Sequence, residues 1–250
     1  MKAMIFAAGL GTRLQPLTDN TPKALIEVAG QTLLERVITR MNKAGFNEIT
    51  INVHHHAQKI IDFLYQKDNF GLDIHISDER NQLLDTGGGI LKARQWLEGD
   101  APFLVHNVDI LTDFDLATFY QHHLASGAMA TVLVKQRQTQ RYLLFDSSLR
   151  LRGWANRQTG QTLPPDVKSK YDKLYALAFG GIHMMSPAIF PVLEQHAAGR
   201  QVFPIIPFYI DKCQENTFLA YPQSPSYHWF DVGRLNTLQQ ANDWYAERQM

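Results

Sequence analysis

Two hydrophobic periods alternate along the first half of the chain. Some runs are apolar or β-branched at nearly every position, as in a buried strand, and others repeat apolar residues at helical spacing. The strand-like runs cover residues 4–8, 48–53, 72–76 and 102–106, and the helical stretches cover residues 33–44, 60–64 and 90–97. This alternation predicts βαβ units and a parallel sheet, with ligands bound at the carboxyl ends of the strands.

The second half has a more mixed pattern. Residues 128–135, 142–146 and 174–182 are strand-like, and residues 235–244 have a helical pattern. Residues 152–173 are mostly polar, and we expect a lid or a disordered segment there because structureless loops of that length are uncommon in compact domains. We therefore expect one α/β domain with two lobes, built on a mixed, mainly parallel sheet flanked by helices.

A glycine-containing loop, Gly9-Leu10-Gly11-Thr12-Arg13, follows the first strand-like run, and Thr21-Pro22-Lys23 comes shortly after it. The glycines let backbone N–H groups approach a ligand closely, while Arg13 and Lys23 add positive charge. Pro22 restricts Thr21 to an extended conformation and so helps to aim Lys23. The pattern predicts a phosphate site, and it lacks both the G-x-x-x-x-G-K-[ST] loop and the third glycine of a dinucleotide fingerprint.

Two aspartates follow apolar runs at distant points of the sequence. Asp109 comes directly after the run that ends near residue 106, and Asp231 follows His228-Trp229-Phe230. Each by itself is also typical of a helix cap or a turn. Together they suit magnesium, which is usually held by one or two carboxylates plus substrate phosphates.

A third segment, Asp85-Thr86-Gly87-Gly88-Gly89-Ile90, precedes a helical stretch. Three glycines leave room for a flat base to lie on the backbone, and a helix N-terminus favours an anion nearby. The alternative is a flexible connection.

These motifs together resemble those of the bacterial nucleotidyltransferases that make NDP-sugars. The family signature G-x-G-T-R-(x)-x-P-x-T, followed by P-K, is matched by residues 9–18 and then by Pro22-Lys23. Asn107-Val108-Asp109 and residues 229–233 resemble the two metal-binding segments of the family, and residues 84–90 resemble the branch that uridylates N-acetylmuramate 1-phosphate. The order of the motifs agrees over nearly the whole chain.

The resemblance implies a Rossmann-like nucleotide-diphospho-sugar transferase fold over residues 1–250, with a nucleotide-binding lobe near 1–115 and a smaller sugar-phosphate-binding lobe near 116–250. The implied catalytic residues are Arg13, Lys23 and Asp109, and the implied magnesium ligands are Asp109 and Asp231. The implied nucleotide-binding residues are Ala8, Gly9, Leu10, Gly11, Thr12, Arg13, Lys23, Asp85, Thr86, Gly87, Gly88 and Asn107. The implied sugar-phosphate-binding residues are Asn156, Gly180, Gly181 and Asp231.

The implied reaction joins an NTP to a sugar 1-phosphate and releases pyrophosphate, with Mg²⁺ as cofactor. The branch favours UTP over GTP and an N-acetylated amino sugar 1-phosphate. The alternatives are a guanylyltransferase acting on mannose- or heptose-1-phosphate, a choline-phosphate cytidylyltransferase, and a regulator that binds nucleotide sugars without catalysis. The chain departs from many relatives at Val108, where they have glycine, and in lacking an E-K-P segment.

Composition narrows the choice of partners. Lys plus Arg equals Asp plus Glu at 24 each, so no overall basic field recruits nucleic acid or an anionic membrane. No run of 18 apolar residues and no signal-peptide pattern is present, from which we expect a cytoplasmic protein. Cys213 is expected to be packed, and neither residues 54–56 nor the pair His122-His123, which we place on a surface helix, has the spacing of a metal site.

Overall fold

The computed structural model describes residues 1–171, 173–222, 224 and 226–248. The strands of the first half are β1 (Lys2–Phe6), β2 (Glu27–Val28), β3 (Gln31–Thr32), β4 (Glu48–Val53), β5 (Asp73–Asp78), β6 (Phe103–Asn107) and β7 (Ile110–Thr112). Its helices are η1 (Thr12–Leu14), η2 (Lys23–Leu25), α1 (Leu33–Lys43), α2 (Ala57–Gln66), η3 (Asp68–Gly71), α3 (Asp85–Lys92), α4 (Arg94–Leu97) and α5 (Leu116–Ser126).

The strands of the second half are β8 (Ala130–Lys135), β9 (Arg141–Phe145), β10 (Leu151–Asn156), β11 (Thr162–Leu163), β12 (Tyr175–Met185), β13 (Phe218–Pro222) and β14 (Trp229–Asp231). The helices are α6 (Val167–Lys170), α7 (Ile189–Ala197), α8 (Ile205–Lys212) and α9 (Leu235–Ala246). The strands and helices that the hydrophobic pattern predicts are present within a few residues of the expected positions. The pattern did not predict the shortest elements, such as β2, β3 and β11, or the helices α7 and α8.

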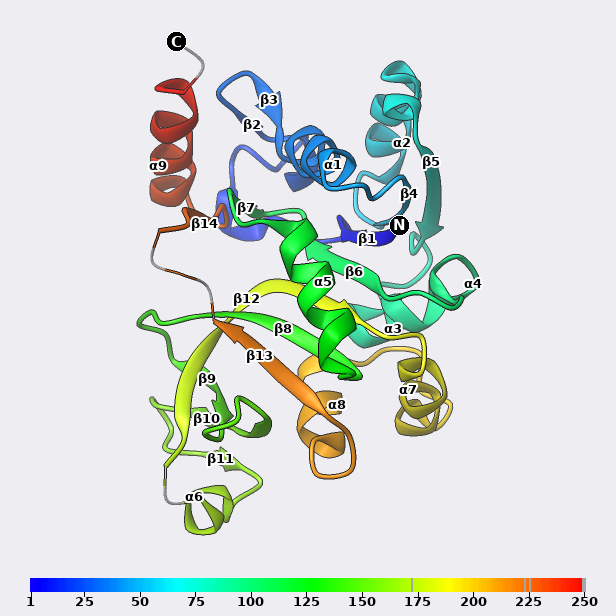
Figure 1. Ribbon diagram of the computed structural model, residues 1–250. Coiled ribbons are helices and arrows are strands. Elements are labelled where there is room, and N and C mark those ends of the chain that lie inside the picture. Colours follow the sequence, from blue (N-terminus) through cyan, green and yellow to red (C-terminus); the bar gives the residue numbers. More distant parts are fainter. Residues whose placement is uncertain (172, 223, 225, 249–250) are drawn as a thin grey trace.

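One mixed sheet runs through both halves of the chain. Its order is β11-β10-β9-β12-β6-β1-β4-β5, and β8 joins it by pairing with β12 and β13. The strands from β6 to β5 are parallel, whereas β12 lies antiparallel to β6, β8 and β9. In Figure 1 the strands β9 to β11 therefore extend the sheet away from the end that carries α1, α2 and α9. The mixed, helix-flanked sheet that the sequence predicts is confirmed, while the lobe boundary near residue 115 stays a prediction.

Alternate side chains of the buried strands enter two hydrophobic cores, one on each face of the sheet. In β1, Ala3 and Ile5 pack into the core that contains residues of α1, α2, α5 and α9. Met4 packs into the opposite core, with residues of α3, α4, α7 and α8. Because both faces of β1 are covered, its sequence is continuously apolar, and its carboxyl end is fixed at the rim of the sheet.

Of the two alternatives expected over residues 152–173, disorder is wrong for the part of that segment that the structure describes, which excludes residue 172, and a lid stays a prediction. Most of it is ordered as β10, β11 and α6, with β10 antiparallel to β9. Leu151 and Gly153 are buried, and the polar or partly exposed residues Arg152 and Trp154 alternate with them. This alternation over a short strand was hidden by the polar residues around it.

His123 is also placed wrongly by the sequence, since it is buried rather than on the surface of α5. Its Nδ1 lies 2.8 Å from Thr131 Oγ1 and its Nε2 lies 3.0 Å from Ser186 Oγ. Both hydroxyls lie outside α5, so the helix pattern alone gives no signal of them. Cys213 is buried as expected, and burial raises the pKa of its thiol. Within the described ranges, no helix is long and apolar enough to cross a membrane.

Three buried histidines make the stability of the fold dependent on pH. Burial lowers the pKa of His106 and of His123 to about 4 and that of His183 to about 3. The unfolded chain binds these protons near pH 6.5, whereas the folded protein binds them only at lower pH. We expect the contribution of these histidines to the free energy of unfolding to be constant above pH 6.5. The free energy of unfolding should fall as the pH decreases from about 6.5 to 4. The expected slope is about 1.4 kcal/mol per pH unit for each histidine.

Urea unfolding at a series of pH values measures this slope. His123→Gln should reduce the slope by the contribution of one histidine, about 1.4 kcal/mol per pH unit. His55→Gln, at an exposed position, should leave the slope unchanged. Equal slopes for the wild type and the His123 variant would contradict the assignment.

Candidate active site

A cleft of about 540 Å³ opens where the first parallel strands end. It is lined by the end of β1 and the loop after it, by Lys23, by the start of α3 and by the residues after β6. Of the residues that the sequence assigns to nucleotide binding, those that line it are Ala8, Gly9, Leu10, Gly11, Thr12, Arg13, Lys23, Asp85, Thr86 and Asn107. Asp109 lines the same cleft. The structure thus brings the first loop, Lys23 and Asp109 to one edge of the sheet.

Lys23 and Asp109 form an ion pair at the floor of this cleft, between Nζ and Oδ2. Lys23 begins the short helix η2 after Pro22, whose backbone is extended (φ −60°, ψ 143°). Its side chain is only 10% exposed and that of Asp109 is 19% exposed. A buried ammonium is costly without a partner, so this pairing keeps both charges in place next to the loop.

Asp231 is brought beside Asp109 by the antiparallel pairing of β14 with β7. In this pairing Asp231 lies opposite Ile110, and the backbone N–H of Val232 donates to the carbonyl of Asp109 at 2.8 Å. Asp231 Oδ1 is buried and has no hydrogen-bond partner among the described residues. A buried carboxylate oxygen is rarely left unpaired, and a cation is one way to satisfy it.

The donor set fits magnesium. Two neighbouring carboxylates offer the oxygen ligands that Mg²⁺ prefers, and the remaining positions are usually filled by water and phosphate. No cluster of three or more His, Cys, Asp or Glu residues with metal-site geometry occurs in the described part of the chain. The arrangement therefore suits an ion that binds together with its phosphate ligand better than an ion in a closed protein cage.

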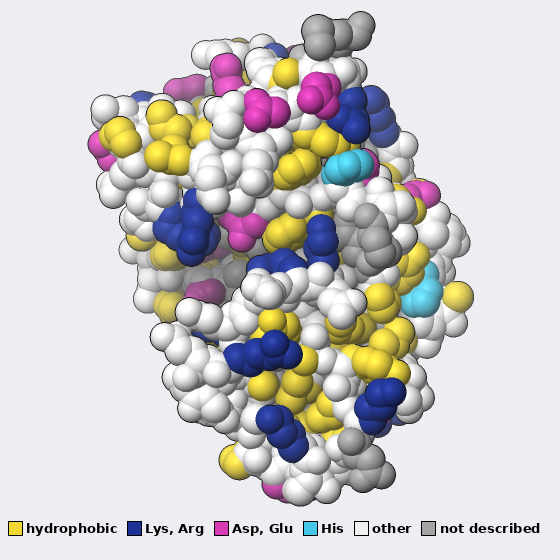
Figure 2. Space-filling model, turned by 90° about the vertical axis from the view of Figure 1, so that its left-hand side faces the viewer, with side chains coloured by type: hydrophobic (Ala, Val, Ile, Leu, Met, Phe, Trp, Pro, Cys, Tyr) yellow, Lys and Arg dark blue, Asp and Glu magenta, His cyan; other side chains and the backbone are white. Residues whose placement is uncertain are grey.

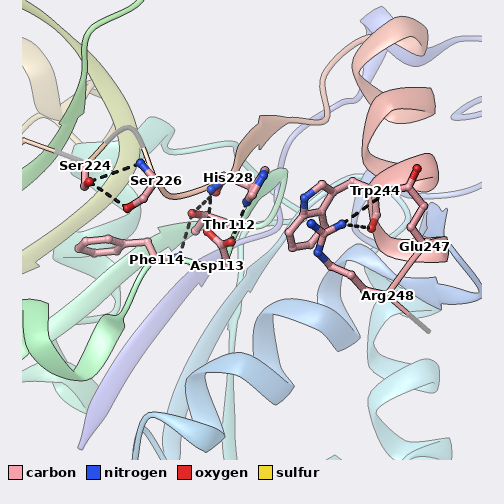
Figure 3. A network of polar contacts seen from close by, with 9 residues as sticks. All are labelled: Thr112, Asp113, Phe114, Ser224, Ser226, His228, Trp244, Glu247 and Arg248. Atoms are coloured by element: carbon pink, nitrogen blue, oxygen red, sulfur yellow. Dashed lines mark hydrogen bonds and ion pairs between the residues drawn. The ribbon is translucent and has the colours of Figure 1, made fainter. Parts of the chain in front are cut away.

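A polar clamp at the start of β14 holds this strand in register (Figure 3). Asp113 accepts the backbone N–H of His228 at 2.7 Å through Oδ1 and contacts His228 Nδ1 at 2.9 Å through Oδ2. The hydroxyl of Thr112 donates to the carbonyl of His228 at 2.6 Å. The ring of Trp244 in α9 lies 4.8 Å from that of His228, and Arg248 stacks on Trp244 at 4.0 Å. The clamp fixes Asp231, three residues further along, relative to β7.

The lack of a side chain at Gly233 leaves room for Arg13 beside Asp231. A Cβ atom on Gly233 would lie 2.8 Å from Arg13 Nη2 and 2.7 Å from Asp231 Oδ1, so any side chain there would displace one of them. Arg13 is exposed and forms no ion pair with another described residue. Its guanidinium is therefore available to an anion at the mouth of the cleft.

Sequence reasoning missed a buried network at the wall of the cleft, which Asn52 itself lines. Asn52, in β4, accepts the backbone N–H groups of Ala7 and Ala8 at 2.7 and 3.3 Å. Its Nδ2 donates to Glu79 Oε1 at 2.9 Å, and Glu79 Oε2 accepts the N–H of Leu84 at 3.0 Å. The available signal was a polar residue near the end of an otherwise apolar strand, because such residues face the ligand edge of a parallel sheet.

Gly87 and Gly88 do not line the cleft, although Asp85 and Thr86 do. Both glycines lie inside α3, where a Cβ on Gly88 would come within 2.0 Å of the carbonyl oxygen of Gln201 and one on Gly87 within 2.4 Å of the Phe203 ring. They allow α3 to pack against the segment before α8. The two residues that face the cleft are therefore those at the start of the helix.

The residues assigned to the sugar phosphate are only partly brought together. Gly181 has a positive φ of 77° at the irregularity in the pairing of β12 with β8, and a Cβ there would lie 2.6 Å from Ile110 and 3.3 Å from Asn107 Nδ2. The carbonyl of Gly180 accepts the indole N–H of Trp229 at 2.9 Å. The side chain of Asn156 stabilises a turn instead, because its Oδ1 accepts two N–H groups of the turn that follows β10.

Comparison with known proteins agrees with this geometry. A family model described as "Nucleotidyl transferase" matches residues 2–145. The N-acetylmuramate alpha-1-phosphate uridylyltransferase of Neisseria meningitidis is 32% identical over 241 residues, which cover 96% of each chain. A protein of the same name from Caulobacter vibrioides is 46% identical over 109 residues, covering 43% of this chain and 45% of the other.

The fold is shared with a solved UDP-glucose pyrophosphorylase from Acinetobacter baumanii. The TM-score is 0.76 at 20% sequence identity, and the match covers 98% of this chain and 92% of the other. The sheet is thus that of the nucleotide-diphospho-sugar transferases. Since the family model spans more than half of the sequence and the Neisseria relative nearly all of it, the chain belongs to the nucleotidyl transferase family.

Proposed function

We propose that this sugar-1-phosphate nucleotidyltransferase joins UTP to an N-acetylated amino sugar 1-phosphate, such as N-acetylmuramate 1-phosphate, in the cytoplasm. The observation that carries the proposal is the convergence of Arg13, Lys23 and Asp109 at one cleft. The pairing of β14 with β7 brings Asp231 next to Asp109, and Asp231 lines the adjoining cavity together with Arg13. Such a set of groups suits phosphoryl chemistry, in which catalysis is mainly positioning and neutralisation of charge. The buried, unpaired Cys213 is consistent with a reducing compartment.

The choice of substrates rests on similarity. The relatives from Neisseria meningitidis and Caulobacter vibrioides both bear the name of an enzyme that uridylates N-acetylmuramate 1-phosphate. The segment from Leu84 to Ile90, which carries Asp85 and Thr86 into the cleft, also resembles that branch. These two similarities favour UTP over GTP.

In the proposed reaction a phosphate oxygen of the sugar 1-phosphate attacks the α-phosphorus of UTP. The new P–O bond forms in line with the bond to the β-phosphate, which breaks as pyrophosphate leaves. The nucleophile is already an anion, so the reaction needs no general base. The backbone amides from Gly9 to Thr12 hold the triphosphate, and Arg13 binds the leaving β- and γ-phosphates.

Lys23 binds the α-phosphate of UTP and the phosphate of the incoming sugar. Its flexible ammonium exchanges the Asp109 carboxylate for phosphate oxygens when the substrates bind. Asp109 and Asp231 would hold the magnesium ion, which would neutralise charge on the phosphate oxygens. Each of these groups stabilises charge that is larger in the transition state than in the bound substrates, and that difference accelerates the reaction.

Replacement of Lys23 should remove one positive charge that stabilises the anion developing in the transition state. We expect Lys23→Ala to lower kcat roughly 100-fold, which corresponds to about 3 kcal/mol. Pyrophosphate release measures the rate, and Lys168→Ala, at an exposed lysine of α6, is the matched control. A folded Lys23 variant with near wild-type turnover would remove Lys23 from the mechanism.

The two carboxylates should act on one ion. Asp109→Asn and Asp231→Asn should each shift the magnesium titration of activity to higher concentration, and the double variant should lose less than the sum of both effects. Calorimetric titration with Mn²⁺ gives a readout that does not depend on turnover. Asp100→Asn changes an exposed aspartate and is the control. If the Asp231 variant keeps the wild-type titration, Asp231 is not a ligand.

A panel of four NTPs against a set of sugar 1-phosphates, with magnesium and pyrophosphate release as the readout, tests the substrates. We expect UTP with N-acetylmuramate 1-phosphate to give the highest kcat/KM, because a pocket that pairs with one base edge leaves buried groups unpaired with another base. Activity with GTP and none with UTP would replace the proposal by a guanylyltransferase acting on mannose- or heptose-1-phosphate. Release from CTP with choline phosphate would indicate the cytidylyltransferase, and none with any pair would indicate a regulator.

A further inference from the structure

A second cavity of about 640 Å³ adjoins the cleft on the side of the second half of the chain. Four arginines line it: Arg13, Arg137, Arg141 and Arg234. We call it the arginine cavity. In Figure 2, which faces the side of the molecule with α9 and β9, Lys and Arg side chains border the hollow in the middle of this face. Of the described residues that line the arginine cavity, Asp231 alone is acidic.

Asp231 offsets only part of the positive charge of this cavity within the described part of the protein. None of the four arginines forms an ion pair there, although other arginines do, such as Arg152 with Asp146 at 2.7 Å. The Nε atom of Arg137 is buried and has no hydrogen-bond partner among the described residues. Buried donors without partners are rare in folded proteins, so this guanidinium is arranged for a ligand.

The arginine cavity lies next to the residues assigned to the sugar. The Arg137 guanidinium stacks on the Trp229 ring at 5.0 Å, with Lys135 on the same ring at 5.4 Å. The indole N–H of Trp229 in turn donates to the carbonyl of Gly180. Burial, followed by the charge of Arg137, lowers the pKa of Lys135, whereas the charge of Asp113 raises it.

The nucleotide does not account for all four arginines. Of the four, only Arg13 also lines the cleft that holds the first loop, and Arg137, Arg141 and Arg234 do not reach that cleft. The helix α9 begins directly after Arg234 with no side-chain cap, and Asn236 and Thr237 of its first turn line the same cavity, so its partial positive charge adds to the field. A sugar that carried only its phosphate would leave these groups facing uncharged hydroxyls.

We infer that the arginine cavity binds a second anionic group of the sugar substrate, a carboxylate on the sugar ring, through Arg137 and Arg141. The inference rests on the proposed function and deepens it, since it makes the enzyme selective for an acidic amino sugar 1-phosphate. A guanidinium matches a carboxylate in a bidentate geometry, which a lysine at the same place does not reproduce. N-acetylmuramate 1-phosphate has such a carboxylate on its lactyl ether, and N-acetylglucosamine 1-phosphate is the same sugar phosphate without it.

The test compares these two sugar phosphates at saturating UTP. We expect the wild type to favour N-acetylmuramate 1-phosphate in kcat/KM by roughly 100-fold or more. In Arg137→Gln this preference should fall roughly 10- to 100-fold, the contribution of a hydrogen bond between charged groups, chiefly through KM for the acidic sugar. The preference of Arg137→Lys should lie between that of the wild type and that of Arg137→Gln. Arg157→Gln, an exposed arginine of the same half of the chain that stacks on Tyr142, is the matched control and should keep the wild-type preference.

Other outcomes separate the inference from the function on which it rests. Equal use of both sugar phosphates by the wild type, or an unchanged preference in Arg137→Gln and Arg141→Gln, would overturn the inference and leave the uridylyltransferase standing. A raised KM for UTP or for pyrophosphate in these variants, with sugar preference unchanged, would assign the arginines to the polyphosphate and also overturn it. No pyrophosphate release from UTP with any sugar 1-phosphate would overturn the proposed function and the inference together.

Discussion

The arrangement of the cleft depends on the buried hydrogen bonds of Asn52 and Glu79. Through them the end of β1, the end of β4 and the segment that leads into α3 are held at fixed distances from one another. Each bond satisfies a polar group that would be costly to bury unpaired, so a displacement of any one segment would leave a donor or acceptor without a partner. The first loop and the start of α3 therefore form two walls of one rigid cleft.

The other wall is made by a distant part of the sequence. β14 pairs with β7, and the contacts of Asp113 and Thr112 with His228 fix the strand that carries Asp231. Asp109 and Asp231 thus meet although more than a hundred residues separate them along the chain. The position of Asp231 is set by the backbone pairing of two short strands, which gives a position more precise than that of a flexible loop.

Much of the fold followed from hydrophobic pattern, and the parts that did not have physical reasons. The continuous apolar run around Ile5 required a strand covered on both faces, which the structure confirms. By contrast, β10 is a strand because β9 and Val167 cover it, and a local pattern does not reveal which neighbour covers a polar segment. The burial of His123 likewise depends on hydroxyls from other elements.

The candidate site shows the same division. Motifs with their own local chemistry, such as the first loop and Lys23, lie where the sequence expected them. The role of Gly87 and Gly88 in packing and the network of Asn52 could not be predicted, because each depends on a partner contributed by another element. Asn156 instead accepts N–H groups of its own turn, and the family resemblance gave no sign of that local use.

The pairing of β7 with β14 also bears on how the protein is made and how it folds. Joining these strands closes a loop that contains about half of the chain, so the entropic cost of this contact comes late and depends on the elements between them being in place. During synthesis the parallel strands and the first loop emerge from the ribosome well before Asp231 does. A nascent chain therefore contains the first loop before it contains Asp231, and under the proposed mechanism the site is complete only after β14 has paired with β7.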